Sequence, residues 1–479
     1  MASILQGRKV LKRRIAQGSQ GPELLSGQFG AQEAEEACRQ EGYVWRERSW
    51  GPLQTLWTFL LQVLHAGSSC RSAVAMALGQ QAAEAALPGG VASSEVLPSL
   101  PSPDPSAYCQ ARQRVPLGVF ERAVRCVGQK LQQRVGQAHA WLGRRVWLVD
   151  GTTCSMPDTP ELQAAFGQPT EQAPGCGFPV AKVVAMFCWA SGAVLEAVIS
   201  PWRQHELHSW RTLWGLLQRL DVVVADRLYC TYMDLAGLVA RGCDGVFRLH
   251  QRRPKDFRQG KRLGKDDRLI TWRRPLKHNR PRGLSVRQWR RLPETMAVRV
   301  LRFRTGVRGF RSRCIYVATS LLDPAAYPLE RIAALYRDRW MIELRFRDIK
   351  ITLGMDVLRG KTPDVVRKEI LMHLLAYNLL RALMWQAAVQ HGKDLHRLSF
   401  AGTVDRLNAF GPYLWLYRRT SKGDAMIALL LRCIAGDAVP DRPNRIEPRA
   451  AKRRPKQYAR LNQPRHQLRR VLQREASRS

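Results

Sequence analysis

The stretch YRDRWMIELRFRDIK, residues 336–350, consists of good helix formers and contains neither glycine nor proline, which predicts a helix. Four of its polar residues follow one another at intervals of three, four and seven positions: Tyr336, Arg339, Glu343 and Lys350. A helix with these intervals places them on one face. One carboxylate beside two cations and a phenol suits a metal ion bound together with a phosphate. The alternative is a solvated charged helix held by intrahelical ion pairs.

The charge of the whole chain favours the first interpretation. Its 479 residues include 77 Lys and Arg against 39 Asp and Glu, a formal net charge of +38. Such an excess predicts a polyanionic partner, and nucleic acid is the leading candidate. A membrane surface is the second candidate, but it usually requires a basic amphipathic helix or a lipidation signal, and neither is found. We therefore expect a nucleic acid partner and no membrane.

Length and cysteine usage indicate a cytoplasmic protein of about two to four domains. The 11 Cys are odd in number and never form a Cys-x2-Cys pair, so neither a disulfide framework nor a zinc ribbon is expected. The N-terminus lacks the apolar core of a signal peptide. The longest apolar helix expected, residues 370–388, contains His373 and Arg381, so no membrane span is predicted.

The N-terminal region, residues 1–140, is expected to be helical and to bind DNA. Helical periodicity is found at residues 31–41, 52–80 and from 106 to about 137, and a Pro/Gly/Ser-rich stretch at 87–105 is typical of a linker. Residues 52–80 fit a helix-turn-helix, which would read the ends of a DNA element. An ordinary helical subdomain fits equally, because nothing marks a recognition helix.

The next segment predicts a mixed α/β sheet with helices on both faces. An apolar run at 145–150 ends at Asp150, and two apolar runs within 179–200 meet at Ser191-Gly192, a hairpin signal. Strands are further expected at 222–225 and 245–249, and helices at 206–220 and 232–241. Sites in such sheets gather at the carboxyl ends of strands, where Asp150 and Asp226 are both expected to lie.

Beyond this sheet the character of the chain changes. Residues 248–291 contain 17 Lys or Arg against three Asp, and the tail from Arg442 onward contains 13 against two Glu. The first segment predicts a β-rich or loop-rich module along a nucleic acid backbone, with Trp272 and Trp289 either in a small local core or on a base. A strand at 314–320 and helices from 329, at 363–391 and at 413–434 complete the expected elements.

Three carboxylates now stand at two strand ends and on one helix face: Asp150, Asp226 and Glu343. Brought together, they would hold a pair of divalent metal ions that clamp the attacking and leaving oxygens of a phosphodiester. Hard cations prefer oxygen ligands, so a His/Cys cluster is not required. His205 and His208 offer another metal pair, but no HExxH pattern supports it. Without metal, the three acidic groups should be partly protonated or loosely held.

Three motifs of this chain resemble the DDE transposases of bacterial insertion sequences with the Tyr-x2-Arg-x3-Glu-x6-Lys signature (IS-four-like). They are YRDRWMIELRFRDIK for the signature, VDGTTCSMPDTP for the first aspartate and VVVADRLYCTY for the second, so the resemblance covers roughly residues 145–384. The tail sequence EPRAAKRRPKQY also resembles the C-terminal end of that family.

The resemblance implies an α/β fold: a ribonuclease-H-like mixed sheet with flanking helices, interrupted by a basic β-rich insertion, plus helical N-terminal and C-terminal subdomains. The implied parts are a catalytic core at 141–247 and 314–360, the insertion at 248–313, a helical C-terminal subdomain at 361–440 and a basic tail at 441–479. It further implies cut-and-paste transposition, in which water attacks at the element's end and the freed 3′ hydroxyl cuts the other strand. The excised end then attacks target DNA.

The resemblance also implies roles for individual residues. Asp150, Asp226 and Glu343 would be the catalytic metal ligands for Mg²⁺, with Mn²⁺ as a substitute. Three further residues would hold the 5′ phosphate end of the DNA: Tyr336, Arg339 and Lys350. Relatives hold a flipped base with a tryptophan of the insertion, here Trp272 or Trp289.

The implied partners are double-stranded DNA, at the element ends and at the target, and a second copy of the chain in a synaptic dimer. The implied location is the nucleoid in the bacterial cytoplasm. Two alternatives remain. A metal-dependent nuclease of the same fold would stop at hydrolysis, and a catalytically inactive DNA-binding regulator would need no metal.

Overall fold

The structure is a computed structural model, and it describes residues 28–45, 50–85, 102–135, 139–253, 255–276, 286–304, 314–417, 420–440 and 461–476. The chain divides into two compact units. Of the described residues, unit 1 comprises 28–135, 191–196 and 345–440, and unit 2 comprises 139–190, 197–344 and 461–476. The expected linker and most of the basic tail lie outside the described residues. No helix in the segments above is both long enough and apolar enough to cross a bilayer.

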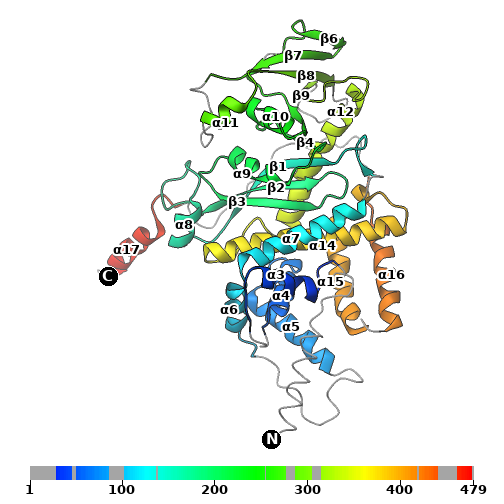
Figure 1. Cartoon of the computed structure of the whole chain (residues 1–479). Helices are drawn as coiled ribbons and strands as arrows, with labels where there is room; N and C mark the ends of the chain where they lie inside the picture. Colours follow the sequence, from blue (N-terminus) through cyan, green and yellow to red (C-terminus); the bar gives the residue numbers. More distant parts are fainter. Residues whose placement is uncertain are drawn as a thin grey trace. The chain divides into compact units, whose positions relative to one another are not determined.

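A nine-stranded mixed sheet has the order β3-β2-β1-β4-β5-β9-β8-β7-β6 (Figure 1). Strands β1, β4 and β5 pair in parallel, and the pairs β1–β2, β5–β9, β9–β8, β8–β7 and β7–β6 are antiparallel. The strands are β1 (Val146–Ser155), β2 (Val180–Cys188), β3 (Val194–Pro201), β4 (Val222–Ala225), β5 (Asp244–Arg248), β6 (Lys261–Gly264), β7 (Asp267–Arg273), β8 (Thr295–Arg304) and β9 (Cys314–Thr319). The predicted mixed α/β class is confirmed.

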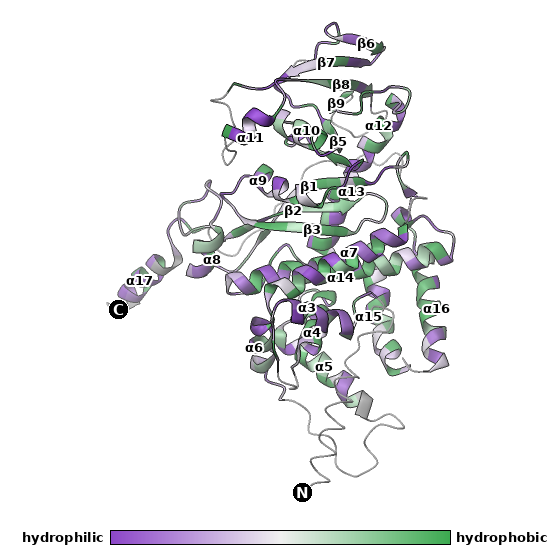
Figure 2. Ribbon diagram, viewed as in Figure 1, coloured by the Kyte–Doolittle hydropathy of each residue, from purple (hydrophilic) through white to green (hydrophobic). Residues whose placement is uncertain are grey.

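The strands form where apolar residues run together. All four residues of β4 are buried, as the continuous apolar run predicts for a strand covered on both faces. The hairpin predicted at Ser191-Gly192 is also confirmed, because Gly192 turns between β2 and β3 with a φ of 78° that disfavours residues with a side chain. Figure 2 shows β2 and β3 as largely hydrophobic, whereas α17 (Arg465–Ala476) is largely hydrophilic.

Strand β1 corrects one prediction about Asp150. This residue was expected to end the strand, but β1 continues to Ser155 because β2 pairs with it along its whole length, from Trp147 to Ser155. The parallel partner β4 pairs only as far as Leu148. Asp150 therefore lies in the middle of β1, two residues beyond the last residue that pairs with β4.

The basic segment continues the same sheet through β8, β7 and β6, which follow β9. Both tryptophans of this segment are buried, with 4% of each exposed, and the guanidinium of Arg253 lies 3.9 Å from the ring centroid of Trp272. This burial favours the small local core over a base-binding position in the described arrangement. A short helix, α11 (Val286–Arg291), precedes β8.

Three further helices of unit 2 connect strands, and two follow the last strand, β9. They are α8 (Pro160–Phe166), α9 (Glu206–Thr212), α10 (Tyr232–Val239), α12 (Leu329–Arg337) and the start of α13 (Met341–Arg347). The helix predicted at 206–220 is shorter than expected. After a 3₁₀ turn at Leu213–Leu216, the Gln218 N–H donates to the Asp221 carboxylate at 2.8 Å, which turns the chain into β4.

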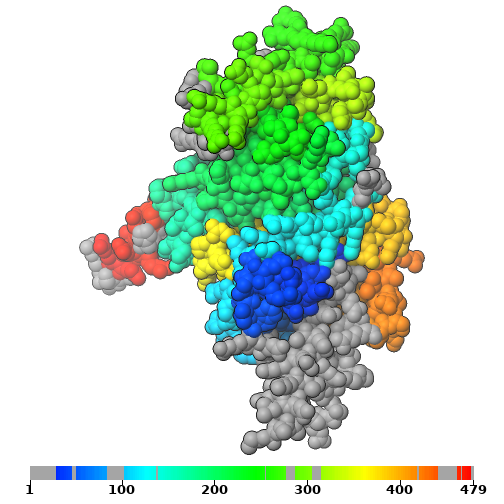
Figure 3. Space-filling model, in the orientation of Figure 1, coloured from blue at the N-terminus to red at the C-terminus, as the bar shows by residue number. Residues whose placement is uncertain are grey.

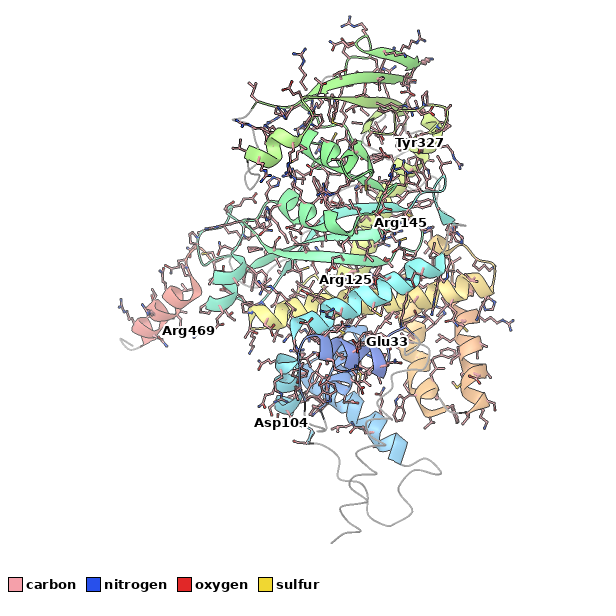
Figure 4. The ribbon with its side chains drawn as sticks, in the orientation of Figure 1. Glu33, Asp104, Arg125, Arg145, Tyr327 and Arg469 are labelled. Atoms are coloured by element: carbon pink, nitrogen blue, oxygen red, sulfur yellow. The ribbon has the colours of Figure 1, made fainter. Side chains whose placement is uncertain are left out.

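The same carboxylate anchors the first strand. Arg145, labelled in Figure 4, donates two bonds of 2.8 Å to Asp221, and the Trp147 indole donates a third at 3.0 Å. Two neighbouring parallel strands are thereby fastened at their N-terminal ends.

Unit 1 is helical. Its helices are α3 (Ala31–Gln40), α4 (Pro52–Leu64), α5 (Cys70–Ala85), α6 (Ser106–Arg114), α7 (Leu117–Val135), α14 (Pro363–Gln390), α15 (Phe400–Tyr417) and α16 (Ser421–Gly436). Helices α7 and α14 pack together, and Asn378 of α14 hydrogen-bonds both the N–H and the carbonyl of Val194 at 2.8 Å. Figure 3 shows α3 (blue) bordered by α7 (cyan), and Figure 4 labels Glu33 of α3, which pairs with Lys130 of α7.

The prediction of one helix at 413–434 is wrong. Two helices, α15 and α16, occupy this range, and Thr420 caps the second by accepting from the Gly423 N–H at 3.4 Å. Pro412 is accommodated inside α15. The apolar pattern alone did not reveal that a capping threonine starts a new helix here.

Candidate active site

The three predicted carboxylates all belong to unit 2. Asp150 stands on β1, Asp226 directly follows β4, and Glu343 stands on α13. The first two elements are paired strands. The side chains thus come from segments far apart in the sequence, as the motifs predict.

Arg339 connects two of these carboxylates. Its Nη2 atom lies 2.7 Å from Oε1 of Glu343, and its Nη1 atom lies 3.5 Å from Oδ2 of Asp150. Only 17% of the arginine side chain is exposed. A single guanidinium therefore occupies a cation position between Asp150 and Glu343.

Asp226 adds a further negative charge close to Asp150. Its Oδ1 accepts the Leu228 N–H at 2.6 Å, an Asx turn that orients the carboxylate at the end of β4. Its charge acts on both Asp150 and Tyr336. Asp226 is thus electrostatically coupled to the other residues of the site.

Asp150 is held in an environment that disfavours its charge. Burial raises its pKa to about 7, and the charges of Asp226 and Glu206 add to this effect. The Gly151 N–H, which donates to Oδ1 at 2.9 Å, and Arg339 act in the opposite direction. The partly protonated carboxyl predicted for the metal-free site is consistent with this pKa.

This pKa predicts a pH-dependent stability in EDTA. Below about pH 4 the Asp150 carboxyl is neutral in both the folded and unfolded states. Between about pH 4 and 7 only the unfolded state carries the charge, so the free energy of unfolding falls across this range by up to about 4 kcal/mol and is then constant. Thermal unfolding from pH 4 to 8 should show a smaller decline in Asp150→Asn than in the unchanged chain. Identical profiles would contradict the buried-carboxyl assignment.

The signature segment is not one continuous α-helix, which corrects the sequence expectation. Helix α12 ends at Arg337, a 3₁₀ turn spans Asp338–Trp340, α13 follows, and residues 348–352 form a π-helical turn. The first break coincides with a tertiary contact, because Asp338 accepts from the Trp189 indole at 3.0 Å. The intervals nevertheless bring Arg339 beside Glu343.

Tyr336 lies next to Arg339 but is only 5% exposed. Its side chain hydrogen-bonds Arg339, and its ring packs edge-on against Phe303 at 6.4 Å. Burial raises the pKa of Tyr336, so the phenol stays neutral, and its oxygen can accept from the Arg339 guanidinium. It supports the arginine in this arrangement.

Within the described residues, Lys350 has no ion pair or hydrogen bond with the other predicted site residues. It belongs to the part of the chain assigned to unit 1, on the π-helical turn, where its Nζ lies 2.9 Å from Oδ1 of Asp356. Its predicted role at a DNA phosphate therefore has no geometric support of its own.

The donor set of the site consists of oxygens, which fits a hard divalent cation. Arg339 already shows that a positive group is accepted between Asp150 and Glu343. Within the described segments, no three acidic, histidine or cysteine side chains approach closely enough to enclose an ion. Arg339 therefore stands where a cation bound by Asp150 and Glu343 would lie.

Two residues near Asp150 were not singled out by the sequence patterns: Glu206 and Tyr229. The sequence drew attention to His205 and His208 instead. The structure gives His205 a different role, since its ring accepts the Leu207 N–H at 3.2 Å and caps α9. The only signal for Glu206 was its place in the first turn of a helix that follows the hairpin.

Comparison with known proteins identifies the class of the chain. Residues 141–379 match the family model described as Transposase DDE domain. Transposase InsG for insertion sequence element IS4 of Escherichia coli (strain K12) is 28% identical over 365 residues, covering 74% of this chain and 78% of the relative. Putative transposase InsZ of the same strain is 29% identical over 143 residues, covering 29% of this chain and 47% of the relative. The piggyBac transposase in a synaptic complex with hairpin DNA aligns over 88% of this chain and 87% of its own, with a TM-score of 0.43 and 8% identity.

The chain is therefore an enzyme of the transposase class with a DDE domain. Within that class it belongs to the IS4 family of DDE transposases. The family implies dependence on a divalent metal ion.

Proposed function

We propose that this transposase moves its own insertion sequence by cut-and-paste, through hydrolysis and strand transfer at the terminal inverted repeats. The observation that carries the proposal is the convergence of Asp150 and Glu343 on one guanidinium, with Asp226 electrostatically coupled to Asp150. Such a group suits the binding of cations beside a phosphodiester.

Asp150, Asp226 and Glu343 would hold Mg²⁺, or Mn²⁺ in its place. When bound, these ions supply Lewis acidity at the scissile phosphodiester. Arg339 would then exchange its carboxylate contacts for phosphate oxygens of the DNA, a geometry that guanidinium groups favour. Tyr336 would hold Arg339 in position from its buried site, and Lys350 would contact the 5′ phosphate end.

The parts of the chain would divide this work. The sheet order β3-β2-β1-β4-β5 supports a ribonuclease-H-like core at 141–247 and 314–360. The basic segment 248–313 would be an insertion lying along the DNA backbone, and the helical regions 1–140 and 361–440 would recognise the element ends and complete the complex. The tail 441–479 would add non-specific attraction to DNA.

The partners of this reaction would be double-stranded DNA and a second copy of the chain. The net charge of +38 supports binding to a polyanion, and two element ends call for two active sites. The bacterial relatives support a place at the nucleoid in the cytoplasm.

A donor plasmid that carries the element's two ends tests the proposal. Incubation with the protein and Mg²⁺ or Mn²⁺ should release the linear element and then join it to a target plasmid. Sequencing of the joints should show both 3′ ends attached to target DNA. Cleaved ends without any joints would instead indicate a nuclease of the same fold, and binding without cleavage would indicate a regulator.

A further inference from the structure

A fourth acidic residue of unit 2, Glu206, lies close to Asp150. It is the first residue of α9, the helix that follows β3 and packs against β2 (Figure 1). The start of this helix is fastened by Ser209, whose hydroxyl lies 3.2 Å from that of Ser200 at the end of β3. The position of Glu206 is therefore determined by the sheet.

The Glu206 carboxylate lies directly against Gly151. A Cβ atom added to Gly151 would stand 2.4 Å from Oε1 and 2.9 Å from Oε2 of Glu206. The same glycine donates its N–H to Asp150 at 2.9 Å. Because residue 151 is a glycine, the Glu206 carboxylate can approach the peptide that orients Asp150. A side chain at position 151 would displace the Glu206 carboxylate.

Glu206 also contacts the segment that follows Asp226. The Tyr229 hydroxyl donates to Oε1 of Glu206, and Tyr229 is fully buried. Because Asp226 bonds the Leu228 N–H, Tyr229 stands at the end of the turn that orients Asp226. One side chain therefore joins the two segments that carry the aspartates.

The charge of Glu206 is not neutralised by an ion pair within the described part of the chain. Arg339 pairs with Asp150 and Glu343, whereas the one hydrogen bond found for Glu206 comes from a neutral phenol. Glu206 is half-buried, lies near another carboxylate and has no cation as a partner among the described residues. Binding of a cation nearby would stabilise its charged form.

From this geometry we infer that Glu206 is a fourth acidic residue of the active site, which increases the affinity of the site for divalent metal. The inference rests on the proposed function, since it requires that Asp150, Asp226 and Glu343 bind the metal. Gly151 provides the space for Glu206, and Tyr229 holds its carboxylate.

Binding of Mn²⁺ to the metal-free, full-length protein in the absence of DNA tests the inference by calorimetric titration. Glu206→Gln keeps the size of the side chain and an acceptor for Tyr229 but removes the charge. We expect its Kd for Mn²⁺ to rise by at least about 10-fold. Gly151→Ala should raise the Kd similarly, because its methyl group displaces the carboxylate.

Matched controls separate charge from position. Glu161→Gln changes the glutamate in the first turn of another seven-residue helix, α8, and should leave the Kd unchanged. Tyr229→Phe removes the hydrogen bond but keeps the charge, so its effect should be smaller than that of Glu206→Gln. If Tyr229→Phe and Glu206→Gln raised the Kd for Mn²⁺ equally, the inference would be overturned. Glu206 would then only hold the segments of Asp150 and Asp226 in place.

Asp150→Asn distinguishes this inference from the proposed function. If Asp150→Asn weakens Mn²⁺ binding while Glu206→Gln does not, only the role of Glu206 is overturned. If neither variant changes Mn²⁺ binding, the metal assignment of the whole site is wrong. Melting temperatures of the metal-free proteins confirm that each variant is folded.

Discussion

Asp150→Asn is expected to reduce both release of the element and its joining to target DNA by at least about 1,000-fold. The change removes the charge of a proposed metal ligand, and metal stabilisation of developing charge is worth several kcal/mol. The effect should be on catalysis, because both steps would use the same carboxylates. It is measured with the two-ended donor plasmid and Mg²⁺.

Folding and DNA binding should survive this change. Asparagine keeps the oxygen that can accept the Gly151 N–H, and it removes a charge whose burial is unfavourable. The metal-free variant should therefore melt at the same or a higher temperature at pH 7.5. The control is Asp158→Asn, which changes an exposed aspartate after β1. This variant should release and join the element at the normal rate. Normal joining by Asp150→Asn would remove Asp150 from the proposed mechanism.

Asp267→Ala is expected to lower the free energy of unfolding by about 3–5 kcal/mol, the usual cost of breaking a buried ion pair. Arg299 on β8 has no exposed surface and donates to Asp267 on β7 at 2.9 Å through Nε and 2.5 Å through Nη2. It also donates to the Tyr327 carbonyl at 2.7 Å. Without Asp267, a buried guanidinium loses its counter-charge.

The neighbouring pair provides a matched control. Arg302 and Asp266 also lie 2.5 Å apart, but 37% and 32% of their side chains are exposed. Asp266→Ala should therefore cost less than about 1 kcal/mol. Urea unfolding followed by tryptophan fluorescence measures both variants. Equal losses would show that burial does not control the contribution of these pairs, and Arg299→Met combined with Asp267→Leu should recover part of the loss.

The Arg299 pair bears on function because Arg299 also holds the basic strands to another part of unit 2. Arg299 joins β7 and β8 to the loop that precedes α12, and α12 leads to the signature segment. A weakened Arg299 contact is thus expected to disturb the approach to Glu343 as well as the fold.

Local patterns were sufficient for many elements of the core. The four apolar residues of β4, the Ser191-Gly192 turn and the start of the helix at Leu329 all follow from side-chain chemistry within a few residues. Asp226, placed directly after such a strand, was predictable for the same reason. These features depend little on distant parts of the chain.

Other features depended on contacts between distant segments. Asp150 lies in mid-strand because β2 extends the pairing of β1, and the signature helix breaks where Asp338 meets Trp189. The position of Glu206 against Gly151 could not be predicted, since the two are 55 positions apart and share no motif.

The sequence by itself determined the polyanionic partner, the α/β class and the residues of the three acidic motifs, because composition, apolar runs and short intervals are local properties. Only the tertiary structure decided that Arg339 stands between Asp150 and Glu343, that both tryptophans of the basic segment are buried, and that a fourth carboxylate approaches the site. The physical reason is that burial, charge pairing and close approach arise when strands and helices from distant parts of the chain pack against one another.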